Sequence, residues 1–321
     1  MNNKKIGKET DEEVLIQTAL SKYGRRAYDT SIAEGHCVSV LRGNSILLVD
    51  SSGIRKKIAT VKQAKTKITQ RKFSLKNKMK RLRIFAGPNG FGKSTIIKVV
   101  TDAGVHLGLY INADEYKKEL NKTHCFNFSN LNIIPSEQDF QDTYHNSLLF
   151  DSSDGKNISR LIMFNKEGFA LPSEYMVNDY FTSFLADYVR NKLLGNCNKF
   201  TFETVMSHPS KLDFICKAQE MKYKVYLYFV SLSDPTLNLN RVQQRVQQGG
   251  HDVPPEKIKE RYYRTMELLL DAIKLVDKAY IFDNSYSEPK LFASIENDEI
   301  KISDNIDYIP TWFQEYVLNK L

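Results

Sequence analysis

The sequence is poor in the features that mark several classes of protein. It has four cysteines in 321 residues, far apart and with no C-x-x-C pair, so their spacing offers no zinc site or disulfide framework. Its longest apolar runs, such as residues 225–230, are far shorter than the roughly 20 residues that cross a bilayer. The amino terminus lacks the apolar core of a signal peptide. We therefore expect a cytoplasmic protein with reduced thiols and no membrane segment.

Negative charge is missing from one stretch of the chain. Residues 51–83 carry 13 Lys or Arg and no Asp or Glu, although the whole chain has a net charge of only +8. Residues 1–83 have a net charge of +13, and residues 84–321 a net charge of −5. The shift predicts a small basic α+β module over residues 1–80 and a larger domain over residues 81–321. Alternating apolar residues in the module predict three short strands: Cys37–Leu41, Ser45–Asp50 and Ile54–Ile58.

From Arg81 onward, apolar runs alternate with helical patterns, which is typical of an α/β fold with a parallel sheet flanked by helices. Ligands of such sheets bind outside the carboxyl ends of the strands. Residues 115–195 predict an insertion between the second and third strands that covers the site, with an amphipathic helix over Tyr175–Leu194. The predicted strands are Leu82–Ala86, Leu107–Ile111, Lys199–Phe202, Tyr223–Leu232 and Lys278–Phe282.

The sequence GPNGFGKST satisfies the phosphate-binding pattern G-x-x-x-x-G-K-[ST] directly after the first of these strands. Glycines allow backbone N–H groups to close around phosphate oxygens. Lys93 is placed to reach the β- and γ-phosphates, and the Ser94 hydroxyl to bind Mg²⁺. A chance match is the alternative, at roughly one per cent for this length. The pattern predicts ATP and Mg²⁺ as cofactors, bound by Gly87, Pro88, Asn89, Gly90, Phe91, Gly92, Lys93, Ser94 and Thr95.

Two carboxylates follow the second and third strands. Asp114 is placed to position an acceptor hydroxyl and accept its proton; the alternative is that it caps a helix over Glu115–Leu120. Glu203, followed by Thr204, is placed to hold Mg²⁺ through water or to contact the substrate, against the alternative of a solvated strand end. These residues predict phosphoryl transfer at the edge of the sheet.

A pair of arginines, Arg241 and Arg245, lies four residues apart and hence on one helix face. Gly249-Gly250 predicts the end of that helix, and the next helix carries further cations. Arginines neutralise the charge of transferring phosphoryl oxygens, so the two helices predict a lid over a triphosphate. The alternative is that some of these side chains form surface salt bridges.

The order of these motifs resembles the zeta-toxin family of bacterial P-loop kinases over roughly residues 81–286. The resemblance rests on the P-loop, Asn112-Ala113-Asp114, Phe202-Glu203-Thr204, Arg241–Val246, Gly249–Pro254 and Asp283-Asn284-Ser285. It implies ATP-dependent phosphorylation of the sugar 3′-hydroxyl of UDP-N-acetylglucosamine. Lys93 would bind phosphates, Asp114 would be the base, Glu203 and Thr204 would contact substrate, and Arg241 would neutralise the transferring phosphate.

The sequence departs from the family pattern at two places. The best-known toxins carry a second arginine where this chain has His251, and Arg245 or Arg261 is left to replace it. A substrate-holding carboxylate of the family has no match in residues 115–195. Two alternatives therefore stay open: a kinase for another metabolite or a polynucleotide end, and a nucleotide-gated switch whose basic amino-terminal part binds nucleic acid.

The resemblance also implies an antitoxin partner, either in cis as residues 1–80 or as a separate chain. The opposite net charges of the two parts favour docking in cis. The basic stretch has Phe73 as its one aromatic residue and matches no nucleic-acid-binding signature. We therefore expect a nucleotide-sugar substrate and do not expect a nucleic-acid or membrane partner.

Overall fold

A computed structural model describes residues 38–42, 45–50, 53–60, 79–88, 90–232, 255–285, 289–304 and 308–321, with the backbone alone over residues 38–60. The chain divides into two compact units, one of Met1–Asn77 with Thr95–Val105 and one of Lys78–Ser94 with His106–Leu321. In the first unit, β1 (Val38–Arg42), β2 (Ser45–Asp50) and β3 (Gly53–Thr60) form an antiparallel sheet in sequence order. The three strands predicted for this segment are confirmed.

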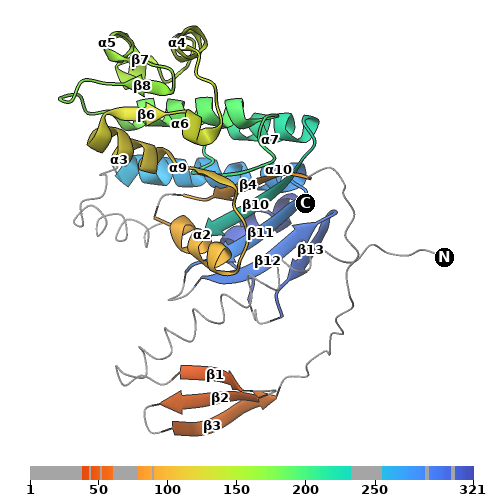
Figure 1. The fold of residues 1–321 in the computed structure, drawn as a ribbon. Helices are drawn as coiled ribbons and strands as arrows, with labels where there is room; N and C mark the ends of the chain where they lie inside the picture. The colour runs from red at the N-terminus through yellow and green to blue at the C-terminus, as the bar shows by residue number, and fades with distance from the viewer. Residues whose placement is uncertain are drawn as a thin grey trace, which may run out of the picture. The chain divides into compact units, whose positions relative to one another are not determined.

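The second unit is built on a seven-stranded sheet whose order is β13-β12-β11-β10-β4-β9-β5 (Figure 1). Five neighbouring strands are parallel and correspond to the five predicted ones. The fold class is therefore confirmed as a mostly parallel α/β sheet flanked by helices. The parallel strands are β4 (Lys80–Ala86), β5 (Leu109–Ile111), β9 (Lys199–Thr204), β10 (Tyr223–Ser231) and β11 (Lys278–Asp283).

An antiparallel edge completes the sheet beyond the predicted strands. β12 (Lys290–Glu296) pairs with β11, and β13 (Glu299–Ile302) pairs with β12. The turn between them holds Asn297 at φ 51° and Asp298 at φ 63°. Two consecutive residues in the left-handed region suit the type I′ turn that joins antiparallel strands, and Asn and Asp tolerate that region best among non-glycine residues.

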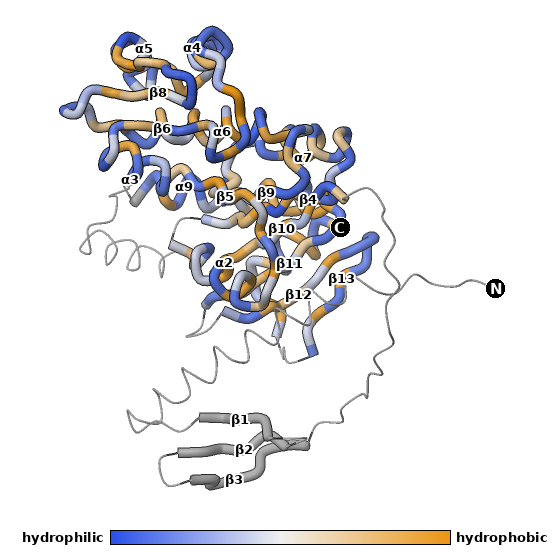
Figure 2. Tube along the Cα trace, in the orientation of Figure 1, coloured by the Kyte–Doolittle hydropathy of each residue, from blue (hydrophilic) through white to orange (hydrophobic). Residues whose placement is uncertain are grey.

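The central strands of the sheet are buried on both faces: every residue of β11 and every residue of β10 except Lys224 is buried. Hydrophobic residues therefore recur along these strands (Figure 2). Phe85 of β4, Tyr228 of β10 and Tyr280 of β11 are register neighbours. Their ring centroids are 4.4 Å and 5.0 Å apart, and both pairs are stacked. The rings therefore join three central strands on one face of the sheet.

Helices occupy most of the remaining chain. They are α2 (Lys93–Asp102), α3 (Ala113–Thr123), α6 (Asp179–Leu193), α7 (Ser210–Glu220), α9 (Pro255–Glu267), α10 (Leu269–Leu275) and α11 (Thr311–Tyr316). The helix predicted from Tyr175 begins later, at Asp179, because the Asn178 side chain accepts a hydrogen bond from the Phe181 N–H and so caps it. Among the described residues, no helix combines the length and apolar content that a membrane crossing needs.

The stretch between β5 and β9 carries a small sheet of its own, with β6 (Cys125–Asn127), β8 (Gly168–Ala170) and β7 (Met163–Phe164) in that order. With α4 (Glu137–His145) and α5 (Gly155–Leu161) it forms the yellow-green part of Figure 1. Aromatic rings fill its interior. The ring centroid of Phe140 lies within 6.3 Å of the ring centroids of six other residues: Phe128, Tyr144, Phe164, Phe169, Phe184 and Tyr188.

Candidate active site

The P-loop lies between β4 and α2, at the carboxyl end of β4, which is the middle one of the five parallel strands. Gly87, Gly90 and Gly92 have φ values of 145°, 80° and 92°, a backbone region that glycine adopts without steric cost. At Gly87 a Cβ would also lie 2.2 Å from the backbone oxygen of Val230 on the neighbouring strand β10. The first glycine of the motif is therefore required twice, by its own conformation and by the strand beside it.

Lys93 begins α2, and its side chain is only 7% exposed. Its Nζ donates hydrogen bonds to the carbonyl oxygens of Gly87 at 2.8 Å and Pro88 at 3.1 Å, so the amine lies over the loop that it serves. Ser94 follows it with an exposed side chain, and Thr95 is the third residue of the helix. Asn89, predicted to bind phosphate, lies outside the described residues.

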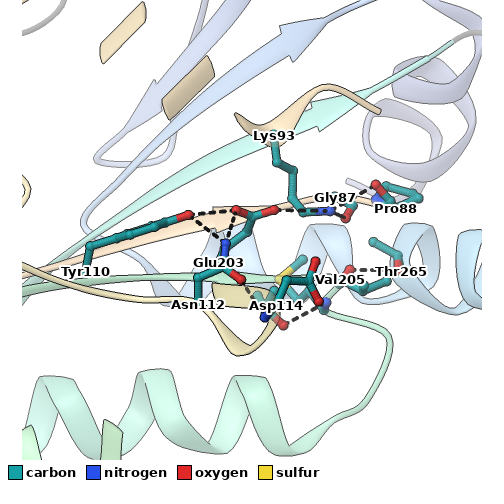
Figure 3. A network of polar contacts seen from close by, with 11 residues as sticks. Gly87, Pro88, Lys93, Tyr110, Asn112, Asp114, Glu203, Val205 and Thr265 are labelled. Carbon is teal, nitrogen blue, oxygen red and sulfur yellow. Dashed lines mark hydrogen bonds and ion pairs between the residues drawn. The ribbon is translucent and has the colours of Figure 1, made fainter. Parts of the chain in front are cut away.

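Glu203 connects the P-loop to the neighbouring strands β9 and β5 (Figure 3). Its Oε2 accepts a hydrogen bond from the Tyr110 hydroxyl at 2.8 Å and from the Asn112 amide at 3.2 Å. Its Oε1 lies 3.9 Å from Nζ of Lys93. One carboxylate oxygen is thus held by two neutral donors while the other faces the Lys93 amine. The alternative of a solvated strand end is wrong, because the Glu203 side chain is only 14% exposed.

Tyr110 and Asn112 were not identified from the sequence as parts of the site. The Asn112 amide also donates to the Tyr110 oxygen at 3.1 Å, which closes a three-membered network with Glu203. Burial first, and then the negative charge of Glu203, raise the pKa of Tyr110 far above its usual value. The phenol therefore stays protonated and keeps donating to the carboxylate. Since Tyr110 and Asn112 flank Ile111 on an alternating strand end, their shared face was the available signal.

Asp114 lies in the first turn of α3 with an exposed side chain, and its neighbour Asn112 takes the capping position. The Asn112 Oδ1 accepts a hydrogen bond from the Asp114 N–H at 2.8 Å. The alternative that Asp114 caps the helix is therefore wrong, because the residue two positions earlier does so. The next carboxyl, Glu115, has its pKa raised by burial and by the charge of Glu203.

Thr204 and the loop after β9 are held by short-range hydrogen bonds. The Thr204 Oγ1 accepts from the Met206 N–H at 3.1 Å, and Met206 is buried with φ 59°. The Thr265 hydroxyl of α9 donates to the Val205 carbonyl at 2.9 Å. These hydrogen bonds, one within the loop and one from α9, hold in place the residues that directly follow Glu203.

The motif Asp283-Asn284-Ser285 at the end of β11 supports the P-loop, a role the sequence left unassigned. The Asn284 amide donates to the carbonyl of Phe91 in the P-loop at 2.9 Å, and its backbone N–H donates to the Ser231 carbonyl of β10. Asp283 is fully buried and accepts from the Ser285 N–H, the Ser285 hydroxyl and the Tyr308 hydroxyl at 2.6 Å.

The predicted lid is only partly within the described residues. Arg241, Arg245 and His251 lie outside them. Arg261 lies on α9, where its carbonyl accepts the Thr265 hydroxyl at 2.7 Å. Arg264 of the same helix forms an ion pair with Glu260 at 2.6 Å on the exposed surface. For Arg264, the surface salt bridge that the sequence left open is the observed arrangement.

The donor set fits Mg²⁺ bound together with a nucleotide. This ion takes one or two protein oxygens besides phosphates and waters. The Ser94 hydroxyl belongs to the residue after Lys93, and Glu203 Oε1 lies 3.9 Å from the Lys93 Nζ. The described residues contain no group of three or more His, Cys, Asp or Glu placed to hold a metal by themselves. Their three cysteines, Cys125, Cys197 and Cys216, are free.

Comparison with known proteins gives a fold likeness of low identity. No family model and no curated protein matches the chain. Among solved structures, a chain of the AvrRxo1-ORF1:AvrRxo1-ORF2 complex with sulphate ions is 17% identical, with a TM-score of 0.45 over 71% of this chain and 62% of that one. The same complex with ATP gives 16% identity, a TM-score of 0.42 and coverage of 70% and 61%. The matched part thus spans less than two thirds of those chains.

A third similar structure comes from the PezAT chromosomal toxin–antitoxin system of Streptococcus pneumoniae. It is 12% identical, with a TM-score of 0.41 over 76% of this chain and 81% of that one. These values leave the chemistry to be argued from the residues of the site itself.

Proposed function

We propose that this chain is an ATP-dependent kinase that phosphorylates a hydroxyl group of a small molecule. The observation that carries the proposal is the placement of three groups at the carboxyl ends of the neighbouring strands β4, β9 and β5: Lys93 after β4, Glu203 on β9 and Asp114 after β5. A buried lysine over a glycine loop, a fixed carboxylate beside it and an exposed carboxylate whose oxygens accept no hydrogen bond from another described residue supply the parts of phosphoryl transfer.

In this mechanism the acceptor hydroxyl oxygen forms a bond to the γ-phosphorus, and the bond from that phosphorus to the β–γ bridging oxygen breaks. The hydroxyl proton passes to Asp114, and ADP is the leaving group. Lys93 exchanges its loop carbonyls for phosphate oxygens, and Glu203 remains fixed by Tyr110 and Asn112. Ser94 and Glu203 would hold Mg²⁺, whose positive charge offsets the negative charge of the phosphates. Arg241 and Arg245 would neutralise the transferring group from the lid.

For the acceptor we propose the sugar 3′-hydroxyl of UDP-N-acetylglucosamine, as the zeta-toxin resemblance implies. The test is incubation of the full chain with ATP and this nucleotide sugar, followed by mass spectrometry for one added phosphate. Formation of ADP with a phosphorylated product of another metabolite would overturn the acceptor and keep the kinase. Absence of any ATP-dependent product across a panel of hydroxylated metabolites and polynucleotide ends would overturn the kinase.

The proposed base is tested by Asp114→Asn, which should abolish turnover while ATP binding, measured by calorimetry, stays close to that of the unmodified chain. Asp213→Asn is a matched control, because Asp213 also lies in the first turn of a helix, α7, with an exposed side chain. Turnover of Asp114→Asn equal to that of Asp213→Asn would show that the proton goes elsewhere, and Glu115 would be the next candidate.

We further propose that the basic residues 1–80 restrain the kinase in cis, in the role of an antitoxin. The support is the net charge of +11 over residues 1–80 against −3 over residues 81–321, which favours encounter of the two parts. Replacing Lys62, Lys65 and Lys67 by Gln in the full chain should raise turnover at low salt. Unchanged turnover, together with salt-dependent retention of RNA or DNA by the unmodified chain, would instead favour the nucleic-acid alternative.

A further inference from the structure

A groove of about 370 Å³ lies between α4 and α5, far along the chain from the P-loop. Gln141 and His145 are four residues apart and share one face of α4, and Lys156, Ser159 and Arg160 share one face of α5. Phe150, in the segment that joins the two helices, completes the lining. The volume is at the lower end of the roughly 300–1,000 Å³ that is usual for small-molecule sites.

The groove carries cationic side chains without countercharge. Lys156 and Arg160 are exposed, and neither forms an ion pair with another described residue. No acidic side chain belongs to the lining. Like charges four apart on a helix destabilise it, and here no carboxylate of the groove offsets that cost. The cations stand out because residues 84–321 are acidic overall, with a net charge of −5.

Two polar atoms of the lining are buried and have no hydrogen-bond partner in the described part of the chain: Oε1 of Gln141 and Oγ of Ser159. The other end of the Gln141 amide is engaged, since its Nε2 donates to the Ser159 carbonyl at 3.3 Å. Buried polar atoms of proteins are satisfied in the great majority of cases. One acceptor and one hydroxyl therefore remain for a ligand that itself carries both donors and acceptors.

The aromatic wall of the groove is fixed. The Phe150 ring packs against Gly155, where a Cβ would lie 2.2 Å from ring atom Cδ2, so a larger residue there would displace the ring. The His145 ring meets Phe150 edge-on at 5.0 Å between centroids. A fixed ring beside two cations provides a flat apolar surface next to a positive one, the combination that stacks a planar ring system and binds its phosphate.

We propose that the α4–α5 groove binds a phosphorylated small molecule of mononucleotide size, separately from the ATP site. Lys156 and Arg160 hold the phosphate, the Ser159 hydroxyl donates to it, and the Gln141 carbonyl oxygen accepts from a donor on the body of the ligand. The body lies along Phe150. The groove is then a second ligand site in the stretch between β5 and β9, independent of whether the P-loop transfers phosphate.

The test uses the full chain with Lys93→Met, which removes the phosphate-binding lysine, and uridine 5′-monophosphate as the probe in calorimetry at low salt. One site is expected, and uridine should bind at least about tenfold more weakly because the phosphate supplies the charged contacts. Adding Lys156→Gln with Arg160→Gln should weaken the monophosphate at least about tenfold. Inorganic phosphate should compete with the probe, and raised salt should weaken it.

The matched control adds Lys217→Gln with Lys222→Gln instead, which removes the same charge from exposed positions on and just after α7. This variant should keep the affinity of the Lys93→Met chain. Equal affinity in the groove variant and the control, or no binding to the Lys93→Met chain, would overturn the proposal. Because turnover of the otherwise unmodified Lys156→Gln, Arg160→Gln chain is a separate measurement, failure here leaves the proposed kinase untouched.

Discussion

A tyrosine, a carboxylate and a lysine meet twice among the described residues, once at the proposed active site and once in the stretch between β5 and β9. At the site, Tyr110 donates to Glu203, whose other oxygen lies 3.9 Å from Lys93. Away from it, Tyr188 donates to Asp139 at 2.6 Å, and Lys192 contacts both oxygens of that carboxylate at 2.6 and 2.7 Å. We call these the site triad and the distal triad.

The two triads differ in where the lysine donates. Lys192 forms an ion pair with Asp139, and the side chains of Lys192 and Asp139 are 36% and 41% exposed. Lys93 is buried, donates to loop carbonyls and stays out of hydrogen-bond range of Glu203. A closed ion pair in water contributes little to stability, whereas a buried ammonium held near a carboxylate, yet not bound to it, can move to an incoming phosphate. The comparison thus distinguishes a structural ion pair, at Lys192, from an arrangement that can change when a ligand binds, at Lys93.

The largest expected difference between the triads comes from removing their lysines. Lys93→Met should lower turnover by ~100-fold or more, as loss of one charged donor to a transition state does, and should weaken ATP in calorimetry. Lys192→Met should leave both unchanged and alter the free energy of unfolding by less than about 1 kcal/mol. Comparable loss of turnover in the two variants would mean that the triads do not differ in function.

A glycine at the site and one in the stretch between β5 and β9 give the next contrast. Gly87→Ala places a Cβ against a backbone oxygen of β10 at a φ that disfavours alanine, and we expect a loss of about 2–3 kcal/mol in stability with loss of ATP binding. Gly155→Ala places its Cβ against side-chain atoms of Phe150 and not against backbone, and a side chain is displaced at lower cost than a strand. This variant should retain ATP binding and cost less in urea unfolding. A larger loss of stability for Gly155→Ala would show that the aromatic segment is the more rigid part.

Removing the tyrosine hydroxyl of each triad tests whether its hydrogen bond to the carboxylate matters for turnover. Tyr110→Phe should lower kcat by roughly tenfold, because a hydrogen bond to a charged group contributes about 1.5–3 kcal/mol, with little change in KM for ATP. Asn112→Ser should act in the same direction, since serine keeps the helix cap and loses the donor to Glu203. Tyr188→Phe removes the same kind of bond at Asp139 and should leave kcat unchanged. Equal kcat for all three variants would exclude a positioning role for Tyr110.

The smallest expected effect is a pH dependence of the distal triad. Burial would raise the pKa of Asp139, but hydrogen bonds from Lys192 and Tyr188 outweigh it and lower the pKa below its usual value. A lowered pKa stabilises the fold above the pKa of the unfolded chain, about 4, and that stabilisation is lost as the pH falls. The stability difference between the unmodified chain and Lys192→Met in urea should therefore be larger at pH 7 than at pH 3. A difference that grows on acidification would contradict the direction.

Sequence reasoning reached the parts of the fold that local pattern determines. The strand beginning at Lys80 and the P-loop after it are specified by consecutive residues, and so is the placement of Glu203 at the end of β9. The partners of Glu203 are not, because Tyr110 lies on a strand of three residues and Asn112 directly after it, some 90 positions earlier. Strand order decides that β5 and β9 are neighbours, and no periodicity in the chain reveals that order.

Two further differences between the predicted and the observed elements have local causes that are visible in the sequence. Asn112, a residue type strongly preferred at N-caps, precedes Asp114 and takes the cap, so the helix starts earlier than predicted. The Asn297-Asp298 turn identifies the β12–β13 hairpin, although the flanking strands are only partly alternating and were not predicted. Asp283 was recognised as part of a motif, but its burial with Tyr308 depends on the packing of residues beyond β13.

The contact between Asn284 and Phe91 joins residues 193 positions apart. Contacts this distant form late in folding because a long loop must close before they stabilise anything. During synthesis the P-loop leaves the ribosome long before β10 and β11 exist to shape it. A nascent chain that has not reached Asn284 should therefore have no competent nucleotide site, and nucleotide binding should appear only after β10, β11 and Asn284 have been synthesised.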